Sequence, residues 1–184
     1  GPGAKASFIA CNAAPANTYG AAVVTSTATP VVAIGKVYGG GMSTAFLGVA
    51  TGSEVMGLPY VRWATDANYN AGLGQRTNIT IQNVGAPLVE TEVIEVEYYD
   101  YAGVLAATHQ IVLGVGGLPT GAKTNSSPSA AGLLEFGYYG SIYGGAAIIR
   151  GPAGSELAAV ARVSSYVVAT SLQVAEDYNS QPIQ

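Results

Sequence analysis

The stretch Thr77-Asn78-Ile79-Thr80-Ile81-Gln82 decides the fold class, because polar and apolar residues alternate along it without a break. Strict alternation with a period of two predicts a β-strand that turns Ile79 and Ile81 toward a core and Asn78 toward solvent. On both sides of this strand the chain has short apolar runs separated by Gly, Pro and Asn, and no convincing helix. The sequence therefore predicts an all-β protein, built as an antiparallel two-layer β-sandwich.

A second pattern follows the first directly and predicts a hairpin. Along residues 88–98 the acidic residues change from even to odd positions, so the polar face changes sides. A strand changes faces only where an extra residue is inserted, and we therefore predict a β-bulge near Val93 and Ile94. Asp100-Tyr101-Ala102-Gly103 predicts a turn, after which residues 104–113 return as the partner strand.

Further strands are expected before and after this hairpin. In the later part of the chain the expected strands are 60–64, 77–83, 88–99, 104–113, 145–150, 156–163 and 166–174. In the earlier part the expected strands are 6–11, 20–26, 30–38 and 43–50. Residues 124–131 are rich in Ser and are expected to form a polar loop.

The beginning of the chain is similar to its end, and the similar segments follow one another in the same order. The matching pairs are 3–5 with 121–123, 19–24 with 143–149, 30–37 with 156–163 and 43–46 with 169–172. Residues 58–120 have no second copy, so we interpret the chain as the back half of a module followed by a complete module. The predicted parts are a partial β repeat for assembly over 1–57, a complete β-sandwich module over 58–175 and a tail over 176–184.

The composition limits the kinds of partner. Only 10% of the 184 residues are charged, 49% are apolar, and the net charge is −4 with 7 basic residues. Nucleic acid is not expected as a partner, because phosphate binding needs clustered Lys and Arg. No apolar run is long enough for a membrane span, since Ser, Thr, Pro, Gly or Lys interrupts each one. We expect part of a surface so poor in charge to be covered by subunit contacts.

Several segments resemble a known class of domain. They are Leu58 to Trp63, Thr80 to Gly85, Val96 to Gly103, Tyr143 to Ile149 and Glu156 to Ala161. Together they resemble the tandem Ig-like β-sandwich repeat domains of bacterial secreted cell-surface proteins, with a half repeat followed by a whole one. The resemblance implies an extracellular location, an Ig-like sandwich used as a building block, and no catalytic residues.

Residues that could carry chemistry are scarce. Cys11 is the only cysteine and His109 the only histidine, so neither a zinc site with several such ligands nor a cofactor is expected. Cys11 is expected to behave as a small buried apolar residue, with a cross-link between chains or a reactive thiol as the alternatives. A hydrolytic enzyme built around His109 stays open as an alternative, because catalytic groups meet in space rather than in sequence. The leading expectation is that the chain is not an enzyme.

The densest charge on the chain is the row Glu90, Glu92, Glu95 and Glu97. We interpret this row as a solvated strand face that discourages aggregation. The alternatives are pairing with cations of a neighbouring subunit, or binding of Ca²⁺, for which no loop with six or more oxygen ligands is evident.

Two sequons, Asn78-Ile79-Thr80 and Asn125-Ser126-Ser127, make Asn78 and Asn125 candidate glycosylation sites. The alternation of the first strand turns Asn78 away from the core, and Asn125 lies in the expected polar loop. Glycans at these positions would help to solubilise a surface with few charges.

The leading functional hypothesis is a structural subunit that polymerises with copies of itself into an extracellular filament or surface layer. An incomplete module leaves strand edges and an apolar face uncovered, and strand donation from another copy would cover them. The candidate interface residues are Ala6, Ser7, Phe8, Ile9, Ala10, Cys11, Ser43, Thr44, Ala45, Phe46 and Leu47. The alternative is an adhesive or carbohydrate-binding module, in which the tyrosine clusters at 98–101 and 138–143 would stack on surface glycans.

Overall fold

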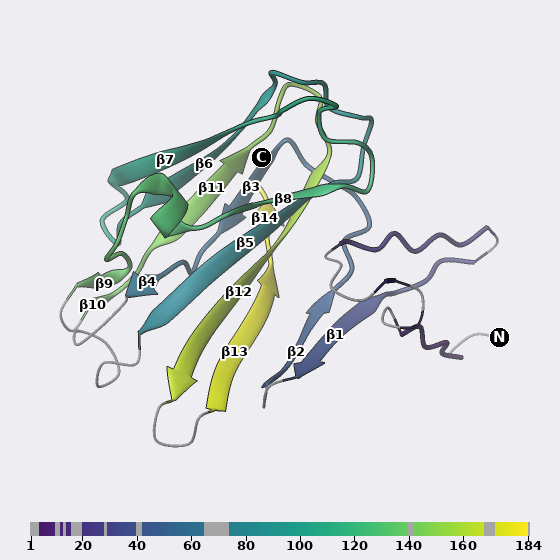
Figure 1. Cartoon of the computed structure of the whole chain (residues 1–184), viewed down its shortest axis with the longest axis horizontal. Helices are drawn as coiled ribbons and strands as arrows, with labels where there is room; N and C mark the ends of the chain where they lie inside the picture. Colours follow the sequence, from purple (N-terminus) through teal and green to yellow (C-terminus); the bar gives the residue numbers. More distant parts are fainter. Residues whose placement is uncertain are drawn as a thin grey trace.

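Antiparallel β-strands make up most of the regular structure of the chain (Figure 1). The computed structural model describes residues 4–9, 12, 14–15, 20–27, 29–39, 42–64, 74–139, 142–167 and 172–183. The first strands are β1 (Ile34–Gly39), β2 (Met42–Leu47), β3 (Val55–Leu58), β4 (Trp63–Ala64), β5 (Gln75–Asn83), β6 (Val93–Tyr99) and β7 (Leu105–Val112). They are followed by β8 (Lys123–Ser126), the 3-10 helix η3 (Pro128–Ala131), β9 (Tyr138–Tyr139), β10 (Ile142–Tyr143), β11 (Ala146–Arg150), β12 (Leu157–Val167), β13 (Leu172–Asn179) and β14 (Gln181–Pro182).

Two sheets form the main body. One has the strand order β14-β3-β11-β6-β7, and the other has the order β13-β12-β5-β4 with β8 also paired to β5. The paired strands in both sheets run antiparallel, and the two sheets pack together around a shared core. The prediction of an all-β protein made of packed antiparallel sheets is therefore confirmed, while the Ig-like assignment stays a prediction. No helix of the described residues is long and apolar enough to cross a membrane.

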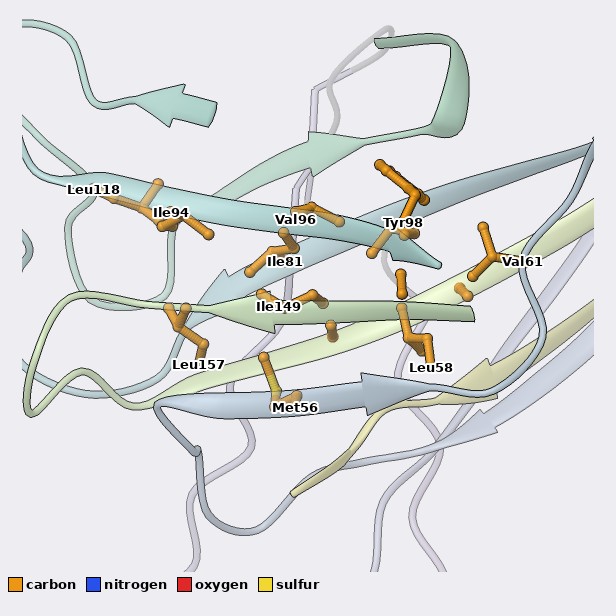
Figure 2. Close-up of a cluster of buried hydrophobic side chains, with 14 of the residues drawn as sticks. Met56, Leu58, Val61, Ile81, Ile94, Val96, Tyr98, Leu118, Ile149 and Leu157 are labelled. Carbon is orange, nitrogen blue, oxygen red and sulfur yellow. The ribbon is translucent and has the colours of Figure 1, made fainter. Parts of the chain in front are cut away.

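The core lies between the two sheets, and side chains from both of them meet in it (Figure 2). Ile79 and Ile81 of β5 are fully buried, while Asn78 is exposed, which confirms the alternation that defined this strand. Each such side chain stabilises the fold by about 1.5–3 kcal/mol when it leaves water. Tyr98 of β6 packs edge-on against Phe136, with ring centroids 5.8 Å apart and an interplanar angle of 79°.

The predicted hairpin is present as strands β6 and β7. Asp100 Oδ1 accepts hydrogen bonds from the backbone N–H groups of Ala102 and Val104, at 2.8 and 2.9 Å. Gly103 has a φ of 77°, a value that glycine adopts without strain. The turn therefore closes through the Asp and Gly residues that predicted it.

The predicted β-bulge near Val93 and Ile94 is wrong. A turn at Glu90 and Thr91 interrupts the expected strand 88–99, and β6 begins only at Val93. Thr91 has a φ of 72°, and its N–H donates to Leu113 O at 2.9 Å. The turn thus changes the polar face, and the register shift between β6 and β7 lies at Tyr98 and Tyr99 instead.

The expected polar loop at residues 124–131 is also partly wrong. Lys123–Ser126 form β8, which pairs with β5, and Pro128–Ala131 form η3. The side chain of Ser127 caps η3 by accepting a hydrogen bond from Ala130 N at 3.2 Å. Polar residues therefore occur here in a short strand, in which Asn125 is exposed and Ser126 is buried, and in a capped turn.

Among the described residues of the earlier part of the chain, β1 and β2 form a hairpin. The expected strand 43–50 is present as β2, and the expected strand 30–38 is present from Ile34 onward. The expected strands 6–11 and 20–26 are wrong for their described residues, which have no regular structure; Ala10 and Cys11 lie outside the described residues. A segment similar to residues 20–24 forms β11, where β3 and β6 supply its hydrogen-bond partners.

The hairpin β1–β2 resembles the hairpin β12–β13, in agreement with the internal similarity of 30–37 to 156–163. Each pair is antiparallel, and each begins with the strand that carries the shared sequence. The predicted part boundaries at 57/58 and 175/176 fall within strands β3 and β13. Residues 176–183 are thus part of the sandwich through β13 and β14.

Candidate assembly interface

The hairpin β1–β2 meets the main body through a buried polar cluster on β12 and β13. Thr44 Oγ1 of β2 donates a hydrogen bond to Asp177 Oδ2 at 2.6 Å. Arg162 holds the same carboxylate with two bonds, Nε to Oδ1 at 2.8 Å and Nη2 to Oδ2 at 2.7 Å. The Asp177 side chain is fully buried, and that of Arg162 is 32% exposed. The carboxylate is therefore satisfied by one strand of its own sandwich and one strand of the hairpin.

Electrostatics keep the Asp177 carboxyl charged in this cluster. Burial raises its pKa, but the hydrogen bonds from Arg162 and Thr44 and the charge of Arg162 outweigh burial and hold the pKa below its usual value. A two-bond Arg–carboxylate contact is among the stronger polar interactions in proteins. The stabilisation that this pair provides is complete above the unfolded-state pKa of Asp and is lost as the pH falls through the folded-state pKa.

A second contact joins β2 to β13 near the end of the hairpin. Asn179 Nδ2 donates to Leu47 O at 2.7 Å. Tyr178, which lies between Asn179 and Asp177 in β13, packs against the core. Since side chains alternate along a strand, Asp177 and Asn179 lie on the face of the sheet that is turned away from the core. The hairpin therefore contacts β13 through side chains that point away from the core, and Figure 1 shows β2 beside β13.

In the described part of the chain, the hydrogen bonds between the hairpin and β13 are made by side chains and one backbone carbonyl. Within the described ranges, β1 and β2 form a separate two-stranded sheet, and no backbone ladder joins either strand to another strand. An open groove lies between the hairpin and β13, lined by Ile34, Ala45, Phe46, Leu47, Asp177 and Asn179. Each of the polar contacts contributes about 1 kcal/mol or somewhat more, so the hairpin is held less tightly than a ladder strand.

One edge of β1 has no partner among the described strands. Gly48 N donates to Ala33 O at 2.8 Å, so these two residues form a hydrogen-bonded pair of the ladder. Hydrogen-bonded and non-bonded pairs alternate along antiparallel strands. The N–H and C=O groups of Ile34, Lys36 and Tyr38 therefore point away from β2, and no strand in the described part of the chain pairs with them.

The hairpin is also internally packed, by one aromatic side chain. The ring of Phe46 lies over Gly35, its partner in the ladder, so closely that a Cβ at position 35 would overlap the ring. Covering a strand glycine with a cross-strand aromatic ring is a known way of fixing register. The absence of a side chain at Gly35 therefore allows the Phe46 ring to pack against the backbone of β1.

The predicted interface residues have different environments. Ala6, Ser7, Phe8 and Ile9 are exposed, and Ala10 and Cys11 are not described. In β2, Ser43, Ala45 and Leu47 are exposed, Phe46 is partly buried, and Thr44 is buried against β13. The exposed large apolar side chains of this part of the chain are Phe8, Ile9, Val23, Val24, Val31, Val32, Ile34, Val37, Tyr38, Leu47 and Val49. The hairpin and the segment before it thus present apolar surface that an isolated subunit leaves in water.

The two candidate glycosylation sites lie on neighbouring strands. Asn78 on β5 and Asn125 on β8 are both exposed. Thr80 Oγ1 donates to Asn125 Oδ1 at 3.2 Å, and Lys123 Nζ donates to the same oxygen at 3.3 Å. Both side chains thus reach solvent, and glycosylation of either stays a prediction.

The four glutamates do not form one site. Glu97 pairs with Arg150 at 3.0 Å, Glu95 accepts from Gln110 at 3.0 Å, and Glu92 accepts from Val89 N at 2.7 Å. No group of three His, Cys, Asp or Glu side chains that could hold a metal ion occurs among the described residues. The row therefore divides into separate local contacts.

His109 takes part in a buried polar network that links the two sheets. Its Nδ1 lies 2.9 Å from Ser126 Oγ, which lies 2.7 Å from the hydroxyl of Tyr98. Burial lowers the pKa of His109 and raises the pKa of Tyr98. Ser126 is itself buried, so a substrate has no direct access to its hydroxyl. This geometry fits a structural role, in which hydrogen bonds hold β6, β7 and β8 together.

The tyrosine cluster at 98–101 does not form a flat binding platform. Tyr98 is fully buried, Tyr99 donates its hydroxyl hydrogen to Glu97 Oε2 at 2.9 Å, and Tyr101 is 57% exposed. Adjacent strand residues point to opposite faces, so Tyr98 and Tyr99 cannot stack on one ligand. The observation weakens the carbohydrate-binding alternative at this cluster.

The chain matches no protein-family model, and comparisons with curated proteins and with solved structures also give no match. The resemblance to tandem Ig-like domains of bacterial surface proteins therefore stays a prediction.

Sequence reasoning singled out Thr44 and Leu47 but missed Arg162, Asp177 and Asn179. Arg162 and Asp177 carry opposite charges on two different strands. They can be recognised as a pair only once the register of β12 and β13 is known.

Proposed function

We propose that the chain is a structural subunit that assembles with copies of itself into an extracellular filament or surface layer. Protomers would join by strand or edge complementation. The observation that carries the proposal is the hairpin β1–β2, which has an open edge on β1 and no backbone ladder to any other described strand. An isolated two-stranded hairpin is marginally stable in water, and an open edge is a template for pairing with another chain.

The distribution of apolar surface supports the same proposal. Val32 is 85% exposed, Tyr38 75% and Ile34 68%, all on or next to β1. A contact between unlike surfaces that does not close on itself produces a fibre. Main-chain hydrogen bonds along the open edge would supply affinity, and the neighbouring apolar side chains would supply buried area.

The test is assembly of the purified chain, followed by size-exclusion chromatography with light scattering and by negative-stain microscopy. Lys36→Pro removes an N–H that points out of the open edge and leaves the β1–β2 ladder bonds in place, so it should prevent or shorten assemblies. The matched control is Lys36→Ala, which removes the charge and keeps the N–H, and it should assemble like the unmodified chain. A compact monomer of the unmodified chain at high concentration would contradict the proposal.

A further inference from the structure

We propose that the hairpin β1–β2 is the element that is exchanged between protomers, and that its receiving surface is the outer face of β12 and β13 around Arg162, Asp177 and Asn179. This inference rests on the proposed function, since it adds to the open edge of β1 a second contact through which copies would join. In each chain the hairpin would leave its own β13 and occupy the equivalent face of a neighbour.

The receiving surface is complete without the hairpin. Arg162 and Asp177 are ladder partners on β12 and β13, so their two-bond contact forms within the sandwich itself. Asn179 lies on the same face of β13. A sandwich that has lost its own hairpin therefore still presents an ordered acceptor for the Thr44 hydroxyl and an ordered donor for the Leu47 carbonyl.

The hairpin β1–β2 of the same chain occupies this surface in the structure. The hairpin contributes Thr44 Oγ1 to Asp177 and Leu47 O to Asn179, and an identical copy presents the same atoms in the same geometry. Exchange replaces each of these contacts by its equivalent, so the exchange itself costs little free energy. The complementarity between hairpin and face thus points to a second copy of the chain.

The connection between hairpin and sandwich is suited to a hinge. Ser53 is anchored by Ser53 N to Leu157 O at 2.9 Å and by Leu157 N to Ser53 O at 3.1 Å. Residues 48–51, which precede it, are exposed and contain no strand. Gly48 still belongs to the hairpin ladder through its bond to Ala33. At about 3.3–3.6 Å per extended residue, the link from Gly48 to Ser53 can span roughly 17 Å, which allows the hairpin to reach a neighbouring subunit.

The exchange also explains why the hairpin exposes apolar residues. Ile34 and Tyr38 belong to β1 and remain exposed when the hairpin lies on its own sandwich. In an open series of exchanges, each hairpin lies between two subunits, and contacts that a monomer cannot make become available to these side chains. The gain in buried apolar area then favours the assembled form over the monomer.

Cross-linking between chains that each carry one cysteine tests the exchange. In a Cys11→Ser background, one chain carries Leu47→Cys and the other carries Asn179→Cys, which leaves Thr44, Arg162 and Asp177 unchanged. The two are mixed under assembly conditions and treated with a short reagent that joins two thiols. We expect a product of two chain masses that requires both variants, and a ladder of higher multiples when one chain carries both substitutions.

The control mixture pairs Leu47→Cys with Val115→Cys, since Val115 is 99% exposed in the turn after β7. It should give only the random background of two-chain product. If assemblies form but the Leu47 and Asn179 cysteines join only within one chain, the exchange is refuted while the proposed function stands. If no assemblies form and every cross-link lies within a monomer, both are refuted.

Discussion

The hydroxyl of Thr44 on β2 donates a hydrogen bond of 2.6 Å to the carboxylate of Asp177 on β13, a residue 133 positions later in the chain. The same hydroxyl oxygen also accepts a hydrogen bond from Arg162 Nη2 at 3.3 Å. Because the acceptor is a buried charge, this bond is stronger than one between neutral groups. The Asp177 carboxylate is therefore a main attachment point of the hairpin, beside the contact of Asn179 with Leu47 O.

Asp177→Ala should destabilise the sandwich and release the hairpin. Arg162 would lose both of its hydrogen bonds to the carboxylate, and Thr44 would lose its acceptor. The expected loss in the free energy of unfolding is about 1.5–3 kcal/mol, the range for hydrogen bonds to charged groups. Urea denaturation measures it, with Glu176→Ala, an exposed neighbour on β13, as the control that should change stability little.

Thr44→Val should loosen the hairpin and leave the sandwich intact. The substitution keeps the shape of the side chain and removes the donor to Asp177, which should cost about 1 kcal/mol. Residues 48–51 should then be cut faster by an unspecific protease, because the hairpin opens more often. Ser43→Val, on the exposed face of the same strand, is the matched control. Equal cutting rates in the two variants would show that the Thr44 bond does not hold the hairpin.

Stability should fall as the pH drops below about 6.5, through His109. Burial lowers the pKa of this residue in the folded state, so at pH values between the folded and unfolded pKa the unfolded chain binds more protons. The contribution is therefore present above the unfolded pKa and is lost as the pH falls. Melting temperatures at pH 8 and pH 5.5 measure the effect. His109→Gln should reduce the difference between them, and an unchanged difference would assign it to other groups.

Ser126→Ala should weaken the tie between the two sheets. It leaves the buried hydroxyl of Tyr98 and the Nδ1 of His109 without their shared partner. The expected cost is about 1–3 kcal/mol, the usual penalty for an unsatisfied buried polar group. Ser129→Ala in η3 serves as the control, because that residue is only partly buried. A chemical denaturation midpoint that is the same in both variants would contradict the role assigned to the network.

Local patterns in the sequence predicted the parts of the fold that depend on local chemistry. The alternation around Ile79 and Ile81 gave the correct strand and the correct buried face, since a sheet with one buried face imposes a period of two. Asp100 and Gly103 gave the correct turn, because each has a specific role in closing it. The same reasoning misplaced the change of face near Val93, since a turn and a bulge both shift the alternation by one residue.

Other parts of the structure depend on contacts between residues that are far apart in the sequence, and a local sequence pattern does not show these contacts. Residues 20–24 are similar to the sequence of β11, but a strand needs a neighbour to accept its hydrogen bonds, and β11 has two. Thr44 and Leu47, which were predicted to lie at a subunit interface, contact β13 within the same chain, and their role between subunits stays a prediction. Asp177 was assigned to a tail, since one acidic residue near the end of a sequence carries no sign of burial.

The packing of Phe46 over Gly35 has an evolutionary consequence. Any side chain at position 35 would displace the ring, so the two positions cannot change independently. Among descendants of this sequence, a residue larger than glycine at 35 should occur together with a small residue at 46. Covariation at this pair would thus record whether natural selection has preserved the hairpin as a folded unit.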